Sequence, residues 1–216
     1  MTTFPNSPRT VKGGIVLIDP ATSAVLRVIT LQYNPDSLTR TLQIKGAGQE
    51  SGDHIEVMRL KGPPIETIKL DAEIDAIDQL AAGDTQATTM GIHPQLAALE
   101  TIVYPASQTL LANNSSASAG NIEIAPAEAP LTLFVWSKNR ILPVRVTEIG
   151  ITEEAFDAAL NPIRAKVSLG MRVLTVDDLG FDNKGGNLFM SYLQQKERLA
   201  TMVAGSLDAL GIRGNP

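Results

Sequence analysis

The segment from Ile65 to Ile77 constrains the fold most, because apolar and polar residues alternate along it one for one. One face would carry Ile68, Leu70, Ala72, Ile74 and Ala76. The other would carry Thr67, Lys69, Asp71, Glu73 and Asp75. Successive side chains of a β-strand point to opposite faces of its sheet, so this period of two predicts a long strand with one buried face. Such a strand needs neighbours and an apolar cover, which makes a β-rich fold the first expectation.

Three more strands are expected before this segment. Gly14 to Ile18 and Val25 to Tyr33 are rich in Val, Ile and Leu, and the turn residues 19–23 between them predict a hairpin. Val25 to Tyr33 has apolar residues on both faces, which predicts a strand that is buried on both sides. After the turn at Asn34-Pro35-Asp36, apolar Leu38, Leu42 and Ile44 alternate with polar residues. This alternation predicts a third, half-buried strand.

Three long strands are expected nearer the carboxyl end, at Leu131 to Trp136, Ile141 to Ile151 and Ile163 to Val176. The turn that separates the last two, from Phe156 to Pro162, is expected to be unusually polar and acidic at Glu153 and Glu154, and the loop from Glu153 to Asn161 is a candidate interface element. Trp136 stands near Phe134 in an apolar strand, where packing in the core or at an interface is expected.

Two helices and two irregular segments complete the prediction. A short helix should begin at His93-Pro94 and end before Pro105, and a terminal helix should run from Leu188 to Leu210. Residues 46–61 are expected to form an extended arm or loop, and residues 111–130, rich in Ala, Asn, Ser and Pro, a flexible insertion. The predicted fold class is therefore mainly β with minor α: an antiparallel sandwich or small barrel with one internal and one carboxy-terminal helix.

Composition excludes several classes of protein. With 216 residues, 44% hydrophobic and 19% charged, the chain should form one main folded domain. It has no cysteine, which excludes disulfides and thiolate chemistry. A net charge of -5 without a basic cluster argues against nucleic-acid binding. No apolar run is long enough for a signal peptide or a membrane span, so we expect synthesis in the cytoplasm and no direct membrane insertion.

Asp71, Glu73 and Asp75 form an acidic row on the predicted strand, at intervals of roughly 7 Å. Two carboxylates within reach of each other could bind a hard cation or hydrolyse a cell-wall glycan by acid–base catalysis. The alternative is a face that is solvated or paired with a partner. The latter is favoured, since the chain has no Asp-x-Asp-x-Asp-Gly loop and the same row begins with Lys69.

A basic row of Arg164, Lys166 and Arg172 shares one face of a later strand. Rows of opposite charge and equal pitch can dock, and across a subunit boundary such pairs would fix register and reject wrong partners. We therefore regard both rows as candidate subunit-interface residues.

Other residues offer little for chemistry. The two histidines, His54 and His93, lack companions at metal-ligand spacing, and no Gly-x-Ser-x-Gly elbow is present. The pairs Gly13-Gly14 and Gly185-Gly186 match no phosphate-binding loop and are expected in turns. We predict no catalytic residue, no metal site and no cofactor.

Several motifs of the chain occur in a distinctive order. The amino-terminal motifs are Leu31-Gln32-Tyr33-Asn34-Pro35-Asp36-Ser37-Leu38 and the run from Gly62-Pro63-Pro64 to Asp75. The later ones are Pro130 to Trp136, Ile151 to Phe156 and Leu160 to Ala165. Together they span most of residues 14–176. Their order and spacing resemble the amino-terminal, tail-tube-like domain of one family, the phage-tail-like contractile injection system tube and baseplate proteins.

The resemblance implies a tail-tube-like β domain over residues 1–180, with the insertion at about 111–130, and a helical extension over 181–216. It implies a hexameric ring that joins the central spike to the inner tube, as a structural adaptor in a particle with other baseplate subunits. Some relatives carry a LysM module, for which this chain is expected to be too short. Candidate interface residues are Asn34, Pro35, Asp71, Glu73, Asp75, Glu153, Glu154, Arg164, Lys166 and Arg172. A cell-wall hydrolase or a cell-wall-binding module remains the alternative.

Overall fold

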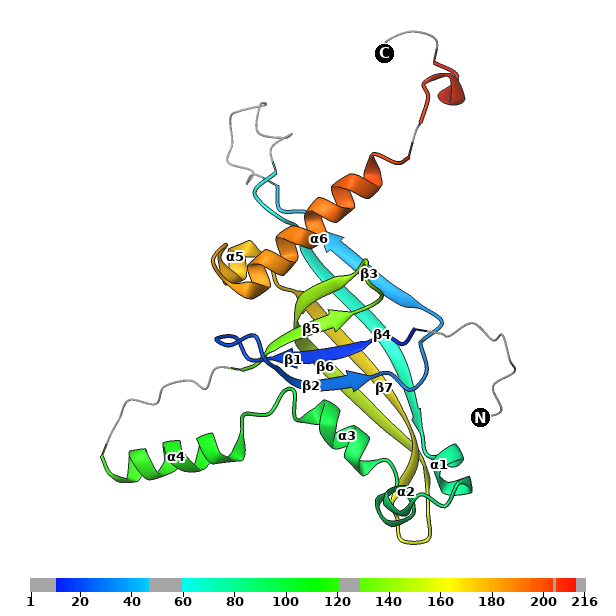
Figure 1. Ribbon diagram of the computed structural model, residues 1–216, viewed down its shortest axis with the longest axis vertical. Helices are drawn as coiled ribbons and strands as arrows, with labels where there is room; N and C mark the ends of the chain where they lie inside the picture. Colours follow the sequence, from blue (N-terminus) through cyan, green and yellow to red (C-terminus); the bar gives the residue numbers. More distant parts are fainter. Residues whose placement is uncertain (1–10, 47–59, 121–128, 204, 213–216) are drawn as a thin grey trace.

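A computed structural model describes residues 11–46, 60–120, 129–203 and 205–212 of the chain. Seven strands form one antiparallel sheet in the order β2-β1-β5-β6-β7-β4-β3. Their bounds are β1 Gly14–Ile18, β2 Val25–Thr30, β3 Leu38–Gln43, β4 Ile65–Asp75, β5 Leu131–Val135, β6 Ile141–Phe156 and β7 Pro162–Val173. The sheet is strongly curved (Figure 1). The predicted class, mainly antiparallel β with minor α, is confirmed.

The centre of the sheet consists of the three longest strands, β4, β7 and β6. The alternation predicted for Ile65 to Ile77 is confirmed, because Ile68, Leu70, Ala72, Ile74 and Ala76 are all buried. On β7 the alternate residues from Ala165 to Val173 are buried too, and they share one core with Phe134 and Leu142 of β5 and β6. Strong period-two patterns therefore predicted both the strands and the buried face.

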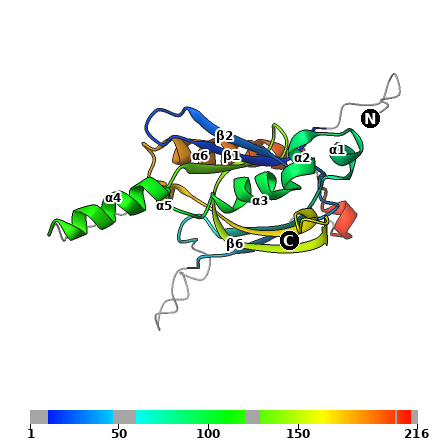
Figure 2. The same cartoon turned by 90° about the horizontal axis from the view of Figure 1, so that it is seen from below.

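Three short helices follow β4. They are α1 Ile77–Ala81, α2 Thr85–Met90 and α3 His93–Glu100. The predicted helix at His93-Pro94 is confirmed as α3, which buries Leu96 and Leu99. Figure 2 shows α3 between the β1–β2 part of the sheet and the β6 part. The other two helices escaped prediction because they are too short to show a period; Asp84 caps α2 by accepting a bond of 2.8 Å from the Ala87 N–H.

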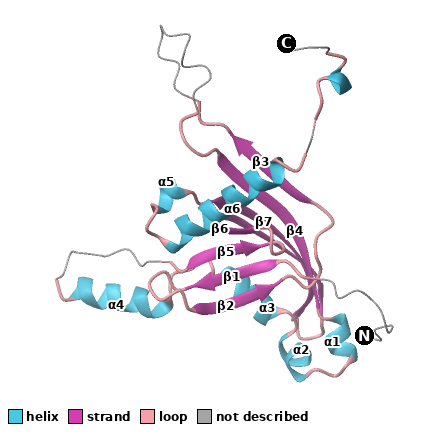
Figure 3. Cartoon of the chain, turned by 45° about the horizontal axis from the view of Figure 1, so that its top comes forward, coloured by secondary structure: helices cyan, strands magenta, loops and turns pink. Residues whose placement is uncertain are grey.

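The last strand leads into α5 Val176–Leu179 and α6 Lys184–Ala200, at the other end of the sheet from α1 and α2 (Figure 3). The predicted terminal helix is confirmed, but its bounds of 188–210 are wrong. Asn183 caps the helix earlier, by accepting a 2.8 Å hydrogen bond from Gly185 N–H. Gly185 and Gly186 therefore lie in the first helical turn, and not in a separate turn as predicted. A Cβ on Gly186 would collide with the carbonyl oxygen of Gly180.

The described residues after Ala200, 201–203 and 205–212, include a 3-10 turn at Asp208–Leu210. The predicted apolar stripe of the terminal helix therefore extends past its end, since Val203 and Leu210 lie outside α6 and are exposed.

The predicted insertion at 111–130 is partly helical. The helix α4, Ser107–Ser118, projects from the body in Figures 1 and 2, and no described residue of it is buried. The lack of apolar anchors thus predicted the absence of packing but not the helix. Residues 121–128 lie outside the described part of the chain, as do residues 47–59 of the predicted arm and His54.

Two burial predictions are wrong, and both concern strands at the ends of the order. The second strand, β2, is not buried on both sides, because Val25, Leu26 and Val28 are 61%, 56% and 57% exposed. On β3 only Leu38 is partly buried among the predicted apolar row, whereas Leu42 and Ile44 are exposed. Apolar residues in a strand do not reveal whether their cover lies in the same chain or elsewhere.

Candidate functional site

The strand order ends at β2 on one side and at β3 on the other, within the residues that the structure describes. The hydrogen bond from Leu31 N–H to Gly13 O, 2.9 Å long, shows which backbone N–H and C=O groups of β2 point toward β1. Backbone groups alternate in an antiparallel strand, so Leu31 and Ile29 face β1 while Val28 and Thr30 turn theirs to the outer edge. The outer edge of β2 therefore offers strand-pairing groups beside exposed apolar side chains.

The β3 edge has a second set of exposed apolar residues, Leu42, Ile44 and Leu60, which we call the β3 tip. Leu42 lies on the same face of β3 as Leu38, which packs against the core, and Ile44 follows directly after the strand. The base of the tip is held in place by the Gly46 to Leu60 bridge and by the Lys45 Nζ to Asp177 Oδ2 ion pair at 3.0 Å. Leu42 therefore lies on the inner face of the sheet but outside the buried core of the described chain.

β2 and the loop after it, residues 27–32, face residues 72–74 of β4 across a gap in the sheet, which we call the seam. The Ala76 N–H donates to Ile163 O on β7, so the backbone groups of Glu73 and Asp75 point away from β7. β4 pairs with β3 only as far as Leu70. Further along β4, the backbone groups of Asp75 bond to the side-chain amide of Gln32 and not to a neighbouring strand. The amide donates to Asp75 O at 2.7 Å and accepts from Asp75 N–H at 2.9 Å.

Above this amide bridge the seam opens into a cavity of about 300 Å³, which we call the seam pocket. Its walls are residues 27–32 from β2 and the following loop and residues 72–74 from β4. Its floor is α3, through Pro94, Gln95, Ala98 and Leu99. Most of the lining is aliphatic or backbone, so the pocket suits apolar side chains better than a charged ligand.

The predicted turn at Asn34 and Pro35 lies next to β1. The Asn34 side chain accepts a 2.9 Å bond from Gly13 N–H and donates a 2.8 Å bond to Val11 O. It thereby pairs with backbone groups that a strand would otherwise satisfy, while Pro35 is half-buried. Asn34 has a structural role in the described chain, and an interface role for the turn stays a prediction.

The acidic and basic rows lie side by side in the same sheet. In the register of β4 with β7, Glu73 stands opposite Lys166 and Asp75 opposite Arg164, whereas Asp71 faces Ser168. Arg164 forms an ion pair with Asp75 at 3.3 Å. The pairing of opposite rows that the sequence suggested across a subunit boundary is therefore present within one chain. Whether these residues also contact a partner stays a prediction.

The acidic pair Glu153 and Glu154 belongs to β6, not to the turn that follows it. Glu154 lies 2.8 Å from Lys166 Nζ, and this hydrogen bond together with the carboxylate's charge raises the pKa of Lys166. Lys166 thus contacts Glu154 on one side and faces Glu73 on the other. This arrangement stabilises the ammonium form and gives Lys166 no character of a general base.

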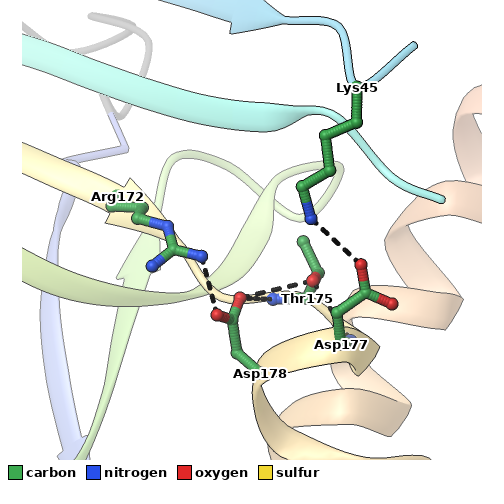
Figure 4. A network of polar contacts seen from close by, with 5 residues as sticks. All are labelled: Lys45, Arg172, Thr175, Asp177 and Asp178. Carbon is green, nitrogen blue, oxygen red and sulfur yellow. Dashed lines mark hydrogen bonds and ion pairs between the residues drawn. The ribbon is translucent and has the colours of Figure 1, made fainter. Parts of the chain in front are cut away.

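The third basic residue, Arg172, is distant from the acidic row and contacts Asp178 at 2.6 Å (Figure 4). Burial raises the pKa of Asp178, but the Thr175 N–H, the Arg172 charge and the Thr175 hydroxyl outweigh it, so the net pKa is lowered. Asp178 and Thr175 also form a capping box at the start of α5. Arg172 therefore holds α5 against the end of β7.

A buried carboxylate, Glu66, was missed by the sequence analysis. It is 3% exposed, lies 2.5 Å from Arg40 and 3.3 Å from Lys196, and so joins β3, β4 and α6. Tyr192 completes the group, since its hydroxyl accepts from Arg40 at 3.0 Å and its ring lies under Lys196. An available signal was the parity of Glu66, which shares the inward face with Ile68.

Chemical sites are sparse among the described residues. No group of three or more His, Asp or Glu side chains there could hold a metal ion. No described helix is long and apolar enough to cross a membrane. Trp136 is half-buried and stacks on Phe134 at 5.9 Å, which confirms the predicted packing role.

No family model and no curated protein matches the chain. Two solved structures show similarity at 10% sequence identity. One is the tail of an empty gene transfer agent particle with C6 symmetry, matched over 75% of this chain and 90% of that chain with a TM-score of 0.30. The other is the virion of a native gene transfer agent particle, matched over 74% and 90% with a TM-score of 0.28. Scores at this level do not establish a shared fold.

Proposed function

We propose that this chain is a structural subunit of a phage-tail-like contractile injection system, in which it acts as an adaptor and not as an enzyme. Copies would form a ring, hexameric in the family that the sequence resembles, between the central spike and the inner tube. The motifs from Leu31 to Leu38 and from Gly62 to Asp75 carry the resemblance.

The observation that supports assembly most directly is the pair of apolar edges at opposite ends of one sheet. An edge strand with exposed Val, Leu and Ile is a hazard for a protein that stays monomeric, and such edges are usually covered, charged or shortened. Here β2 exposes Val25, Leu26 and Val28, and β3 exposes Leu42. Because the two edges differ, their contact is heterologous, and a heterologous contact repeats into a ring when the rotation closes.

The alternative of a cell-wall hydrolase draws on the acidic row, and the geometry around that row speaks against it. A retaining or inverting glycosidase needs one carboxyl group that stays protonated and one that is ionised, in different environments. Glu73 and Asp75 instead stand in similar surroundings: each lies opposite a cationic side chain of β7, Lys166 and Arg164 respectively, and Asp75 forms an ion pair with Arg164 at 3.3 Å.

Co-expression with the neighbouring spike and tube proteins tests the proposed function. We expect the chain to sediment with assembled particles and to appear in them as a ring. A chain that is absent from purified particles and remains monomeric beside its neighbours would contradict the proposal. A muralytic assay separates the alternative, since glycan cleavage that disappears in Asp71→Asn and Glu73→Gln variants would make the chain a hydrolase.

A further inference from the structure

We infer that the seam pocket of one copy receives the β3 tip of the next copy, so that Leu42 and Ile44 of one chain pack on α3 of another. This inference rests on the proposed function and names the contact through which the ring would form. It joins two features that have no partner among the described residues: an apolar pocket beside one edge and an apolar projection at the other.

The first step of the argument is the direction of the two faces. Leu42 shares the inward face of β3 with Leu38, and Ile44 follows directly after the last residue of the strand, Gln43. Ile29 on β2 is packed against the same core as Leu38. If β3 of one copy extends the sheet beyond β2 of another, the inward faces of the two strands become continuous. Leu42 and Ile44 would then lie on the same side as α3, which forms the floor of the seam pocket.

The second step is the supply of backbone partners. The outer edge of β2 presents the groups of Val28 and Thr30, and Glu73 on β4 presents groups that point away from β7. Because β3 is already paired with its own β4 on one side, its free edge is the one that can add to the outer edge of β2 in another copy, as in strand addition to a sheet edge. The Gln32 amide already imitates such a strand at Asp75, and it marks the closed end of the seam.

The third step is the fit of the apolar surfaces. Leu42 and Ile44 are 47% and 72% exposed in the single chain, and the pocket that would receive them is walled by Ile29, Leu31 and Ile74. Contact between the tip and the pocket would bury the exposed apolar area of both chains from water, which favours association. The exposed ion pair between Lys45 and Asp177 joins the base of the tip to α5.

The same tip cannot serve as its own partner in the described chain. β3 is paired with β4 from Leu38 to Gln43, and in Figure 1 the strand β3 and the helix α3 lie toward opposite ends of the molecule. The proposed contact therefore needs a second copy. Another apolar candidate for the pocket among the described residues is the set Met202, Val203, Leu207, Leu210 and Ile212, and the experiment includes it as a separate outcome.

A chain without cysteine allows a clean cross-linking test. We would place cysteines at Leu42→Cys and Ala98→Cys in one chain and oxidise it under conditions where the wild-type chain forms oligomers. Each copy then carries one tip thiol and one pocket thiol, so a heterologous contact should yield a ladder of covalent dimers, trimers and higher species. A mixture of the two single variants should stop at a dimer that contains one of each.

Two matched pairs of cysteines serve as controls for the cross-linking test. Replacing the tip thiol by one on the projecting helix, Ser116→Cys with Ala98→Cys, should give no ladder. Leu207→Cys with Ala98→Cys tests the carboxy-terminal segment, and a ladder from this pair in place of the Leu42 pair would overturn the inference.

Oligomers that form without any Leu42 to Ala98 cross-link would overturn the inference and leave the proposed function standing. A wild-type chain that stays monomeric at every concentration and beside its particle neighbours would overturn both.

Discussion

The centre and the edges of this sheet differ in what holds them in place. In the centre, β7 lies between two long neighbours, and its inward residues from Ala165 to Val173 are buried to 2% exposure or less. At the edges, β2 and β3 each pair on one side and expose Leu and Val side chains of the same kind. The same residue types thus stabilise the fold in one region and are available for a partner in the other.

The largest expected effect lies in the centre. Leu169→Ala on β7 should lower the free energy of unfolding by about 2–5 kcal/mol, because it leaves a cavity among buried neighbours. Leu42→Ala on the β3 edge is the matched control and should change it by about 0.5 kcal/mol or less. Urea unfolding of both variants measures the comparison, and equal losses would contradict the distinction between centre and edge.

The buried carboxylate on β4 should have the next largest effect. Glu66→Gln removes the anion that Arg40 and Lys196 share, and we expect a loss of about 1–3 kcal/mol in unfolding free energy. The control is Glu197→Gln, which changes an exposed residue of α6 next to Lys196 and should be nearly neutral. If both variants unfold alike, α6 does not depend on this group.

A smaller effect should depend on pH. The pKa of Asp178 is lowered in the folded chain, so its stabilising contribution is present above the unfolded pKa near 3.8 and is lost as pH falls through the lower folded value. Asp178→Asn should therefore cost about 1 kcal/mol at neutral pH, and the gap to wild type should close below about pH 4. Asp182→Asn, an exposed change in the loop after α5, is the control and should be nearly neutral. A gap between Asp178→Asn and wild type that persists at low pH would show that charge is not the cause.

The smallest expected effect on stability concerns the two charged rows. Glu73 and Lys166 face each other across β4 and β7, so a double-mutant cycle with Glu73→Lys and Lys166→Glu should give about 0.2–1 kcal/mol of coupling. If the rows also contact a neighbouring subunit, each single reversal should weaken assembly and the double reversal should partly restore it. Sedimentation of the three variants measures this second effect independently of stability.

The sequence predicted most of the centre and little of the edges, for a physical reason. Alternation from Ile65 to Ile77 reports which face is buried, and the structure confirms it because the apolar residues that cover this face of β4 belong to the same chain. For Val25 to Tyr33 the same kind of pattern predicted burial on both sides, and the described chain leaves this strand exposed. The apolar residues of a strand indicate that it is favourable to bury them, but they do not indicate whether the same chain or a partner buries them.

The polar sites were predicted unevenly. Asp71 to Asp75 and Arg164 to Lys166 were identified as rows of equal pitch, but their adjacency required the strand order, which local pattern does not contain. Glu66 was missed because its partners Arg40 and Lys196 are 26 and 130 residues away in the chain. The helices α1, α2 and α5 were missed because four to six residues are too few to display a period.

Sedimentation velocity of the wild-type chain and the variant Val28→Pro tests the central claim most directly. Proline at this position removes an N–H that faces the outer edge of β2, so it blocks strand addition while sparing the bonds to β1. We expect wild type to form a closed oligomer of defined size, and the variant to sediment as a monomer with nearly unchanged urea unfolding. A variant that assembles like wild type, or a wild type that never assembles, would contradict the account.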